Sequence, residues 1–233
     1  MITGRLRDFV KVQYLANTRQ WRMFAFLYRL VGNNRRRVRG RGNRLELGGC
    51  LLRNVLFDVD GDNNHVIVHS GSRLADTTIH IRGFNHRLEI GRFCAYSGEL
   101  WLEDSGCRIV IGEHTTIYGA HLAATEPGSV ITVGKECLFS QGIQVRTGDS
   151  HSIIDTGTNR RINPAQDVEI GDHVWIGRDV KLLKGSAVGT HSIIGTGSIV
   201  TERIPPNSLA VGIPAKVVRT EVTWAAERLK QQQ

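Results

Sequence analysis

One histidine lies where this sequence could carry out proton-transfer chemistry. His151 belongs to a polar stretch, residues 146–167, that is rich in Asp, Ser, Asn and Arg. An imidazole titrates near neutral pH, so it is well suited to take the proton of a hydroxyl group. Asp149 and Asp155 are near enough in sequence to orient the imidazole, although each could equally be a solvated loop acid. From residue types alone, a solvated surface histidine is the simpler interpretation.

Two other features of this region could bind a substrate. Arg160 and Arg161 could hold an anionic acceptor through charge-assisted hydrogen bonds, and a solvated pair is the alternative. Trp175 lies 24 positions after His151, between two residues expected to point inward, so it should point outward. An exposed aromatic side chain there would line a cleft or pack against another subunit, and we favour the cleft.

The chain around this stretch is periodic. Six segments of similar form begin 21, 22, 21, 22 and then 37 residues apart: L-E-L-G (45–48), V-I-V-H (66–69), L-E-I-G (88–91), I-V-I-G (109–112), I-T-V-G (131–134) and V-E-I-G (168–171). A finer period of six links Ile170, Ile176, Leu182, Val188, Ile194 and Val200. The repeat pauses only for residues 146–167, which we expect to form an extruded loop.

A branched aliphatic residue every six positions predicts short strands separated by corners. Three such units form a triangular coil, and stacked coils bury a continuous core that no single repeat could bury alone. We expect about eight coils at about 4.8 Å each, a prism roughly 38 Å tall. The small connecting loops should contain Gly61, Gly83, Gly106 and Gly128. Cys94 and Cys137 fall at interior positions.

Four motifs in the repeat region resemble a known family: D-S-H-S-I (149–153), V-W-I-G (174–177), I-G-T-G-S-I-V (194–200) and G-I-P-A-K-V (212–217). They are similar to those of the left-handed β-helix hexapeptide acyltransferases, in the maltose, galactoside and polysialic acid O-acetyltransferase group. The resemblance covers about residues 45–218 and implies an all-β, left-handed parallel β-helix. It also implies that His151 is the catalytic base, that Trp175 belongs to the site, and that a homotrimer forms active sites between subunits.

Acetyl-CoA is the co-substrate that the resemblance implies, with no metal. The resemblance assigns its groove to Trp175, Gly177, Arg178, Thr196, Thr201, Lys216 and Arg219. Lys216 and Arg219 are the expected phosphate contacts. Glu202 departs from the galactoside type, which has a lysine there. Asp149, Arg160 and Arg161 are the expected acceptor-binding residues. Small corner residues and solvated charges would account for the same side chains without a ligand.

The basic residues are concentrated at the N-terminus. Residues 1–44 hold 12 of the 30 Lys and Arg and one acid, Asp8. Met23, Phe26, Leu27, Leu30 and Val31 have helical spacing, and six arginines follow between 35 and 44. We favour a helix that caps the core, followed by a solvated linker. The alternative is peripheral contact of this arm with an anionic membrane or a polyanion.

The chain thus divides into a basic helical arm (1–44), a β-helix (45–218) and a C-terminal helix and tail (219–233). Its four cysteines form no C-x-x-C pair and read as reduced core residues. We find no run of apolar residues that would span a bilayer and no secretion signal, and expect a cytoplasmic protein, with the membrane's inner face as the alternative. No nucleic-acid partner is expected.

These observations predict an acetyl-CoA-dependent O-acetyltransferase that modifies a sugar hydroxyl in capsule, sialic acid polymer or lipopolysaccharide. An N-acetyltransferase acting on an amino sugar or nucleotide sugar differs only in the acceptor atom and stays open. A metal enzyme like the γ-class carbonic anhydrases would need three convergent histidines. A scaffold that binds polyanions through the arginine-rich arm would not need to interrupt its repeat.

Overall fold

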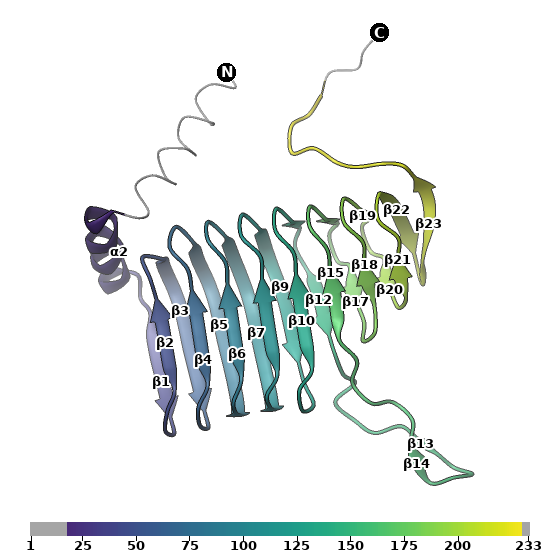
Figure 1. The fold of residues 1–233 in the computed structure, drawn as a ribbon, viewed down its shortest axis with the longest axis horizontal. Coiled ribbons are helices and arrows are strands. Elements are labelled where there is room, and N and C mark those ends of the chain that lie inside the picture. The colour runs from purple at the N-terminus through teal and green to yellow at the C-terminus, as the bar shows by residue number, and fades with distance from the viewer. Residues whose placement is uncertain (1–17, 230–233) are drawn as a thin grey trace.

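The computed structural model describes residues 18–229, which wind into a triangular prism of parallel strands (Figure 1). Eight short strands stack in parallel to form its first side, which we call face one. They are β2 (Arg44–Leu47), β4 (His65–Val68), β6 (Arg87–Ile90), β8 (Arg108–Ile111), β10 (Val130–Val133), β15 (Val168–Ile170), β18 (Ala187–Val188) and β21 (Arg203–Ile204). One strand per coil gives the eight coils that the sequence predicts.

The other two sides share four long strands that bend around the corner between them. These are β3 (Leu51–Asp60), β5 (Arg73–Phe84), β7 (Ala95–Ser105) and β9 (Thr116–Ala124). Their first halves continue, as face two, into β11 (Leu138–Phe139), β16 (Trp175–Ile176), β19 (Ile193–Ile194) and β22 (Ser208–Gly212). Their second halves continue, as face three, into β12 (Ile143–Arg146), β17 (Lys181–Leu182) and β20 (Ile199–Val200). The left-handed parallel β-helix is therefore confirmed.

The core is a column of aliphatic side chains inside the prism. All six residues of the finer repeat are buried, as are Ser186, Ser192 and Ser198 at the small positions between them. The four cysteines are buried free thiols. Burial raises the pKa of Cys94 and of Cys137 to about 11, so both stay protonated and unreactive at neutral pH. The predicted interior positions of Cys94 and Cys137 are confirmed.

The arginine-rich stretch is not the solvated linker that we expected. Arg35–Arg39 forms β1, which pairs in parallel with β3 from Leu56 to Asp60. The guanidinium of Arg36 lies 6.0 Å from the ring of Phe57, over the end of the core. The β-helix therefore begins about ten residues before the predicted boundary at residue 45, because the exposed edge of β3 pairs with whatever extended chain precedes it.

The N-terminal helix is present but faces the other way. α2 (Arg19–Val31) begins at Thr18, whose side chain accepts a hydrogen bond from the Trp21 N–H. The five residues predicted to cap the core are exposed, and Ala25, on the opposite side, is buried. The prediction of an apolar cap is wrong, because the helix meets the first coil through Ala25 and through hydrogen bonds from Trp21 and Arg29 to backbone carbonyls. Residues 1–17 of the predicted arm lie outside the described residues.

The predicted C-terminal helix is also wrong for the residues described. β23 (Ala215–Thr220) forms an antiparallel hairpin with β22, and residues 221–229 contain no helix. The Val222 N–H donates to the carbonyl of Asn207, and Trp224 docks on the prism. A helix of this length is marginal by itself, so the tertiary contacts of the tail determine its conformation.

Two glycines in the connecting loops predict a difference in stability. A Cβ on Gly83, whose φ is +114°, would lie 1.9 Å from the carbonyl oxygen of Asp104 in the next coil. We expect Gly83→Ala to lower the free energy of unfolding by about 3 kcal/mol. Gly128→Ala is the matched control, since its φ is +78° but no atom lies within 4 Å, and should cost about 1 kcal/mol. Urea unfolding measures both, and equal losses would contradict the close approach.

Candidate functional site

The loop with His151 and the strand with Trp175 leave the prism on opposite sides. Residues 147–167 connect β12 on face three to β15 on face one, so they project from the corner between those faces. Trp175 belongs to β16 on face two, the side opposite that corner. Trp175 is 41% exposed, so its side chain points outward as predicted. One prism alone therefore does not bring His151 and Trp175 together.

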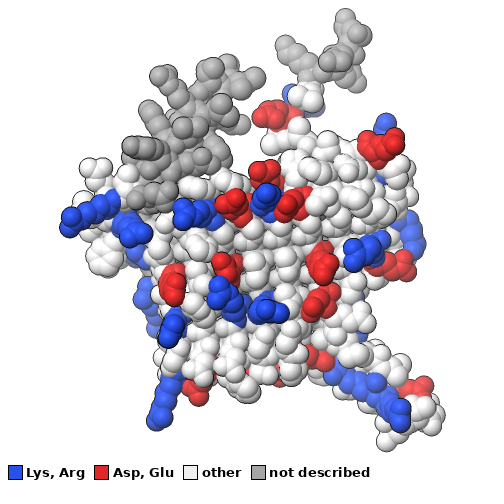
Figure 2. All heavy atoms as spheres, viewed as in Figure 1, with Lys and Arg blue, Asp and Glu red and all other residues white. Residues whose placement is uncertain are grey.

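The loop is an ordered hairpin, not an irregular insertion. β13 (Ile154–Asp155) pairs in antiparallel with β14 (Arg160–Arg161) at its tip. The hairpin projects from the lower right of Figure 1, and the same region of Figure 2 shows both basic (blue) and acidic (red) side chains. Asp155 turns the tip by accepting hydrogen bonds from the N–H and hydroxyl of Thr158, both at 2.7 Å. The carboxylate of Asp155 therefore stabilises the turn of the hairpin.

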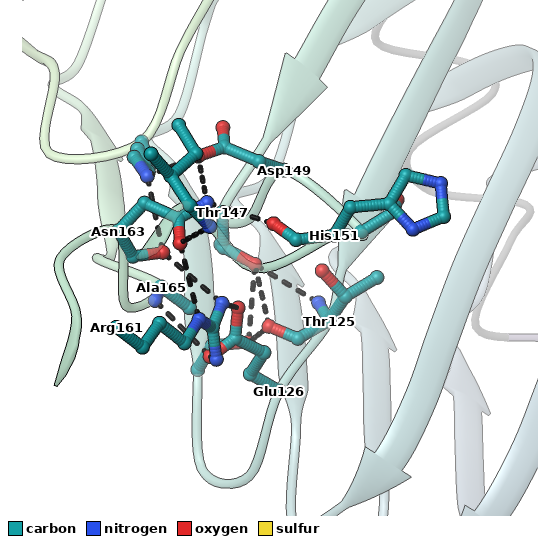
Figure 3. A network of polar contacts seen from close by, with 12 residues as sticks. Thr125, Glu126, Thr147, Asp149, His151, Arg161, Asn163 and Ala165 are labelled. Atoms are coloured by element: carbon teal, nitrogen blue, oxygen red, sulfur yellow. Dashed lines mark hydrogen bonds and ion pairs between the residues drawn. The ribbon is translucent and has the colours of Figure 1, made fainter. Parts of the chain in front are cut away.

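Asn163 holds the base of the loop (Figure 3). Its Nδ2 donates to the carboxylate of Asp149 and to the carbonyl of His151, both at 2.8 Å. Its Oδ1 accepts from the N–H of Ile153 at 2.7 Å and from Nε of Arg161 at 3.1 Å. The residue is 5% exposed and uses every hydrogen-bonding position of its amide. Asn163 thus holds the His151 carbonyl, the Ile153 N–H and the Asp149 side chain in one network.

Two ion pairs attach the loop to the prism. Arg161 pairs with Glu126 on the coil before the loop, and the guanidinium holds the pKa of that carboxyl below its usual value. Lys184, on the coil after the loop, pairs with Asp149 and lowers the pKa of Asp149 in the same way. Both carboxylates stay charged at neutral pH, so both pairs hold the loop there and weaken as the pH falls toward the carboxyl pKa values.

These contacts show which of the polar residues predicted for the site hold the loop in place and which do not. The imidazole of His151 points away from the Asn163 network (Figure 3). Asp149 and Asp155, the two acids considered as its orienting partner, both form hydrogen bonds elsewhere. Arg161 is used to hold the loop, whereas Arg160 is exposed on β14. Of the site residues predicted in this loop, His151 and Arg160 are therefore the ones whose exposed side chains lie outside these contacts.

Sequence reasoning missed a second tryptophan beside Trp175. The indole of Trp224 stacks on the ring of His173 at 4.6 Å, with 11° between the planes. Its Nε1 donates to the His173 carbonyl at 2.8 Å, and the centre of its ring lies 6.2 Å from that of Trp175. No pattern pointed to Trp224, since the helical interpretation of the tail placed other residues on the packed face. The two indoles form an aromatic wall on face two.

The residues assigned to the acetyl-CoA groove are partly brought together. Gly177 and Arg178 lie at the corner after β16, and Thr196 lies at the same corner one coil later. The coils touch there, because a Cβ on Gly177 would lie 2.7 Å from the backbone nitrogen of Thr196. Together with Trp175, these residues line one edge of face two.

The other three groove residues lie nearer the C-terminal end of the prism. Lys216 and Arg219 are exposed on β23, the last strand of the sheet that includes face two. Thr201 follows β20, at the corner between faces three and one. The ammonium group of Lys216 lies 3.4 Å from the carboxylate of Glu202. An exposed pair of this kind is weak, so Lys216 could exchange it for a phosphate group.

Several remaining histidines have a structural explanation. His114, His173 and His191 occupy the same corner of three coils, with φ values of 59°, 54° and 62°, and Glu136 takes that corner on the coil between His114 and His173. Within residues 18–229, no group of three or more His, Cys, Asp or Glu side chains is placed to hold a metal ion. No observation in that range favours the metal-enzyme alternative.

Three comparisons relate this chain to known proteins. Residues 167–202 match the family model described as bacterial transferase hexapeptide (six repeats). A polysialic acid O-acetyltransferase of Neisseria meningitidis is 31% identical over 66% of this chain and 72% of its own length. The polysialic acid O-acetyltransferase of Escherichia coli O1:K1 / APEC is 34% identical over 52% of this chain. That match spans only 39% of the Escherichia coli protein.

A solved structure extends the similarity across most of the fold. The crystal structure of the polySia specific acetyltransferase NeuO superimposes with a TM-score of 0.78 at 30% identity, over 86% of this chain and 92% of that one. The polysialic acid O-acetyltransferase OatWY shares the fold, with a TM-score of 0.54 at 23% identity. No helix in residues 18–229 has the length and hydropathy needed to cross a membrane.

Proposed function

This chain belongs to the hexapeptide-repeat acetyltransferases, and from this premise we propose that it acetylates a sugar hydroxyl of a surface polysaccharide. The acyl donor is acetyl-CoA. The acceptor is a polymer such as capsule, polymerised sialic acid or lipopolysaccharide, and the similarity to two polysialic acid O-acetyltransferases supports a polymer of sialic acid. Of these acceptors we favour an anionic one, because Arg160 is exposed on the same hairpin that carries the base.

The observation that carries this proposal is the way in which the backbone of the loop around His151 is held. A solvated surface histidine would need no fixed backbone, yet Asn163 binds its carbonyl and two ion pairs attach its loop to neighbouring coils. The ring itself stays outside that network. A rigid backbone with a free imidazole is what a general base requires, since the ring must reach a substrate proton.

The reaction follows from one proton transfer and one acyl transfer. A ring nitrogen of His151 accepts the hydroxyl proton while the sugar oxygen attacks the thioester carbonyl carbon. The tetrahedral intermediate collapses by breaking the carbon–sulfur bond, and the imidazolium returns its proton to the leaving thiolate. Backbone N–H groups at a coil corner are the donors available to stabilise the oxyanion. The products are the acetyl ester and CoA.

The placement of Trp175 supports a site shared between subunits. His151 leaves one corner of the prism and Trp175 lies on the opposite face, so a second copy must supply one of them to each site. Three prisms packed side by side in a closed ring would place each His151 corner against a neighbour's face two. The Trp175 and Trp224 rings then form a wall for the acyl donor, with Arg178, Lys216 and Arg219 toward its phosphates.

Mixed assemblies test both the activity and the shared site. His151→Ala and Trp175→Ala subunits should each be poorly active alone, whereas co-refolding them should restore transfer at interfaces where an intact His151 meets an intact Trp175. Transfer of labelled acetyl groups from acetyl-CoA to a panel of neutral and sialylated glycans is the readout. Mixtures no more active than the single variants would contradict the shared site, and no labelled product with any glycan would contradict acetyl transfer.

A further inference from the structure

The N-terminal end of the prism exposes an apolar helix face. Five residues of α2 at helical spacing are between 53% and 82% exposed: Met23, Phe26, Leu27, Leu30 and Val31. Phe24, beside them, is 51% exposed. A soluble surface usually scatters such residues singly, and a contiguous apolar arc marks an interaction site. The sequence predicted this face correctly as apolar but placed it against the core.

The helix is fixed in this orientation by its other side. Ala25 is buried, Nε1 of Trp21 donates to the carbonyl of Gly49 at 2.8 Å, and Arg29 donates to the carbonyl of Leu47 at 2.9 Å. The chain after the helix is also tied down, since Gly32 accepts a hydrogen bond from the N–H of Asn54. The apolar arc therefore cannot turn toward the core without breaking these contacts.

Positive charge surrounds this arc. Residues 18–44 contain nine arginines and no acidic residue: Arg19, Arg22, Arg29, Arg35, Arg36, Arg37, Arg39, Arg41 and Arg44. Blue side chains mark this end of the molecule at the left of Figure 2. Arginines on β1 would protect an exposed edge strand from association. Edge protection does not explain the apolar face of α2, so the two features together need another explanation.

We propose that this end of the prism docks on an anionic lipid bilayer. The arc of α2 would enter the headgroup region and the arginines would bind lipid phosphates, as interfacial amphipathic helices do. A soluble polyanion would use the arginines but not the Phe, Leu and Met side chains. A second copy meeting end to end would oppose nine arginines with nine more, which charge repulsion disfavours. Only an anionic, partly apolar surface satisfies both features.

The proposed trimer strengthens this inference, which in that respect rests on the proposed function. Prisms packed side by side in a closed ring point their N-terminal ends the same way. Three arcs and 27 arginines, three times nine, then face one plane. Three weak contacts to one membrane multiply into a much stronger attachment.

Vesicle binding tests the proposal. The full chain should bind vesicles of phosphatidylglycerol and phosphatidylcholine at least about tenfold more tightly than pure phosphatidylcholine vesicles, measured by co-sedimentation. Leu30→Asp should weaken that binding about tenfold, because it places a carboxylate on the apolar arc. Leu229→Asp is the matched control, since Leu229 is 78% exposed against 68% for Leu30 and lies at the other end of the described chain, and this variant should bind as the parent does. Arg35→Ser/Arg37→Ser should also weaken binding about tenfold.

Three results would overturn the proposal. Equal binding to both vesicle types would show that anionic lipid is not needed, which contradicts the proposed role of the arginines. Binding that resists Leu30→Asp but disappears in high salt would make the surface a polyanion site. A change of oligomer mass or a large loss of thermal stability in Leu30→Asp would show that the arc packs against protein. The assay needs no acetyl transfer, and Leu30→Asp should keep full activity on a soluble glycan, so failure here is distinct from failure of the proposed function.

Discussion

Replacing His151 with alanine should reduce acetyl transfer to the sugar by about 10²- to 10⁴-fold. The substitution removes the proposed base and nothing else, since the hydrogen bond from Asn163 goes to the backbone carbonyl of residue 151. The loop should therefore keep its shape, and the prism its stability. Release of the CoA thiol in the presence of acceptor measures the rate, and thermal unfolding with light scattering verifies fold and assembly.

A second histidine provides the control for this experiment. His65 lies on face one, where its ring contacts Glu46 at 2.8 Å, far along the prism from the loop. His65→Ala should leave the rate unchanged. If His151→Ala retains the parent rate, His151 is not the base, whatever the motif around it.

Removing the Asn163 side chain should slow the reaction about 10- to 100-fold although this residue is not proposed to touch substrate. Asn163→Ala deletes all four hydrogen bonds of this amide, two of which hold the His151 carbonyl and the Ile153 N–H. The base would remain present but less well placed. Because the loss falls on positioning, kcat should drop while the pH profile of the reaction keeps its shape. Stopped assays over a range of pH measure both.

Asn163→Asp separates hydrogen bonding from volume. Aspartate has the same shape, but its second oxygen would face the carboxylate of Asp149 and the carbonyl of His151, where Asn163 now donates. We expect a loss at least as large as that of Asn163→Ala. A fully active aspartate variant, or a large fall in the unfolding temperature of the prism with either substitution, would show that Asn163 serves folding and not the positioning of His151.

The fold could be predicted because its cause is local and repeated. Each coil contacts mainly the next coil, so a short period such as Ile170, Ile176 and Leu182 identifies the core residues directly. The loop could be found for the same reason, as the place where that period pauses. Asn163 and Trp224 could not, because their partners, His151 and His173, are brought near only by the fold.

Two elements at the N-terminal end of the prism show where prediction from sequence patterns fails. An apolar helical face ordinarily predicts burial, but α2 is held by Trp21 and Arg29 through backbone carbonyls, which have no sequence signature. The sequence of Arg35–Arg39 predicts a solvated chain, yet this segment pairs with the edge of β3 as a strand. At both places a single tertiary contact surface, and not a repeated one, decides the structure.

The 37-residue interval between β10 and β15 also has a consequence for how this protein can change. Pairing Ile131 with Val168 closes a longer segment than the 22 residues between Ile109 and Ile131. Chain entropy grows only with the logarithm of loop length, so the extra residues cost about 0.5 kcal/mol. A lineage can therefore lengthen, shorten or exchange this hairpin almost without thermodynamic penalty. New acceptor preferences can arise there while the solenoid stays the same.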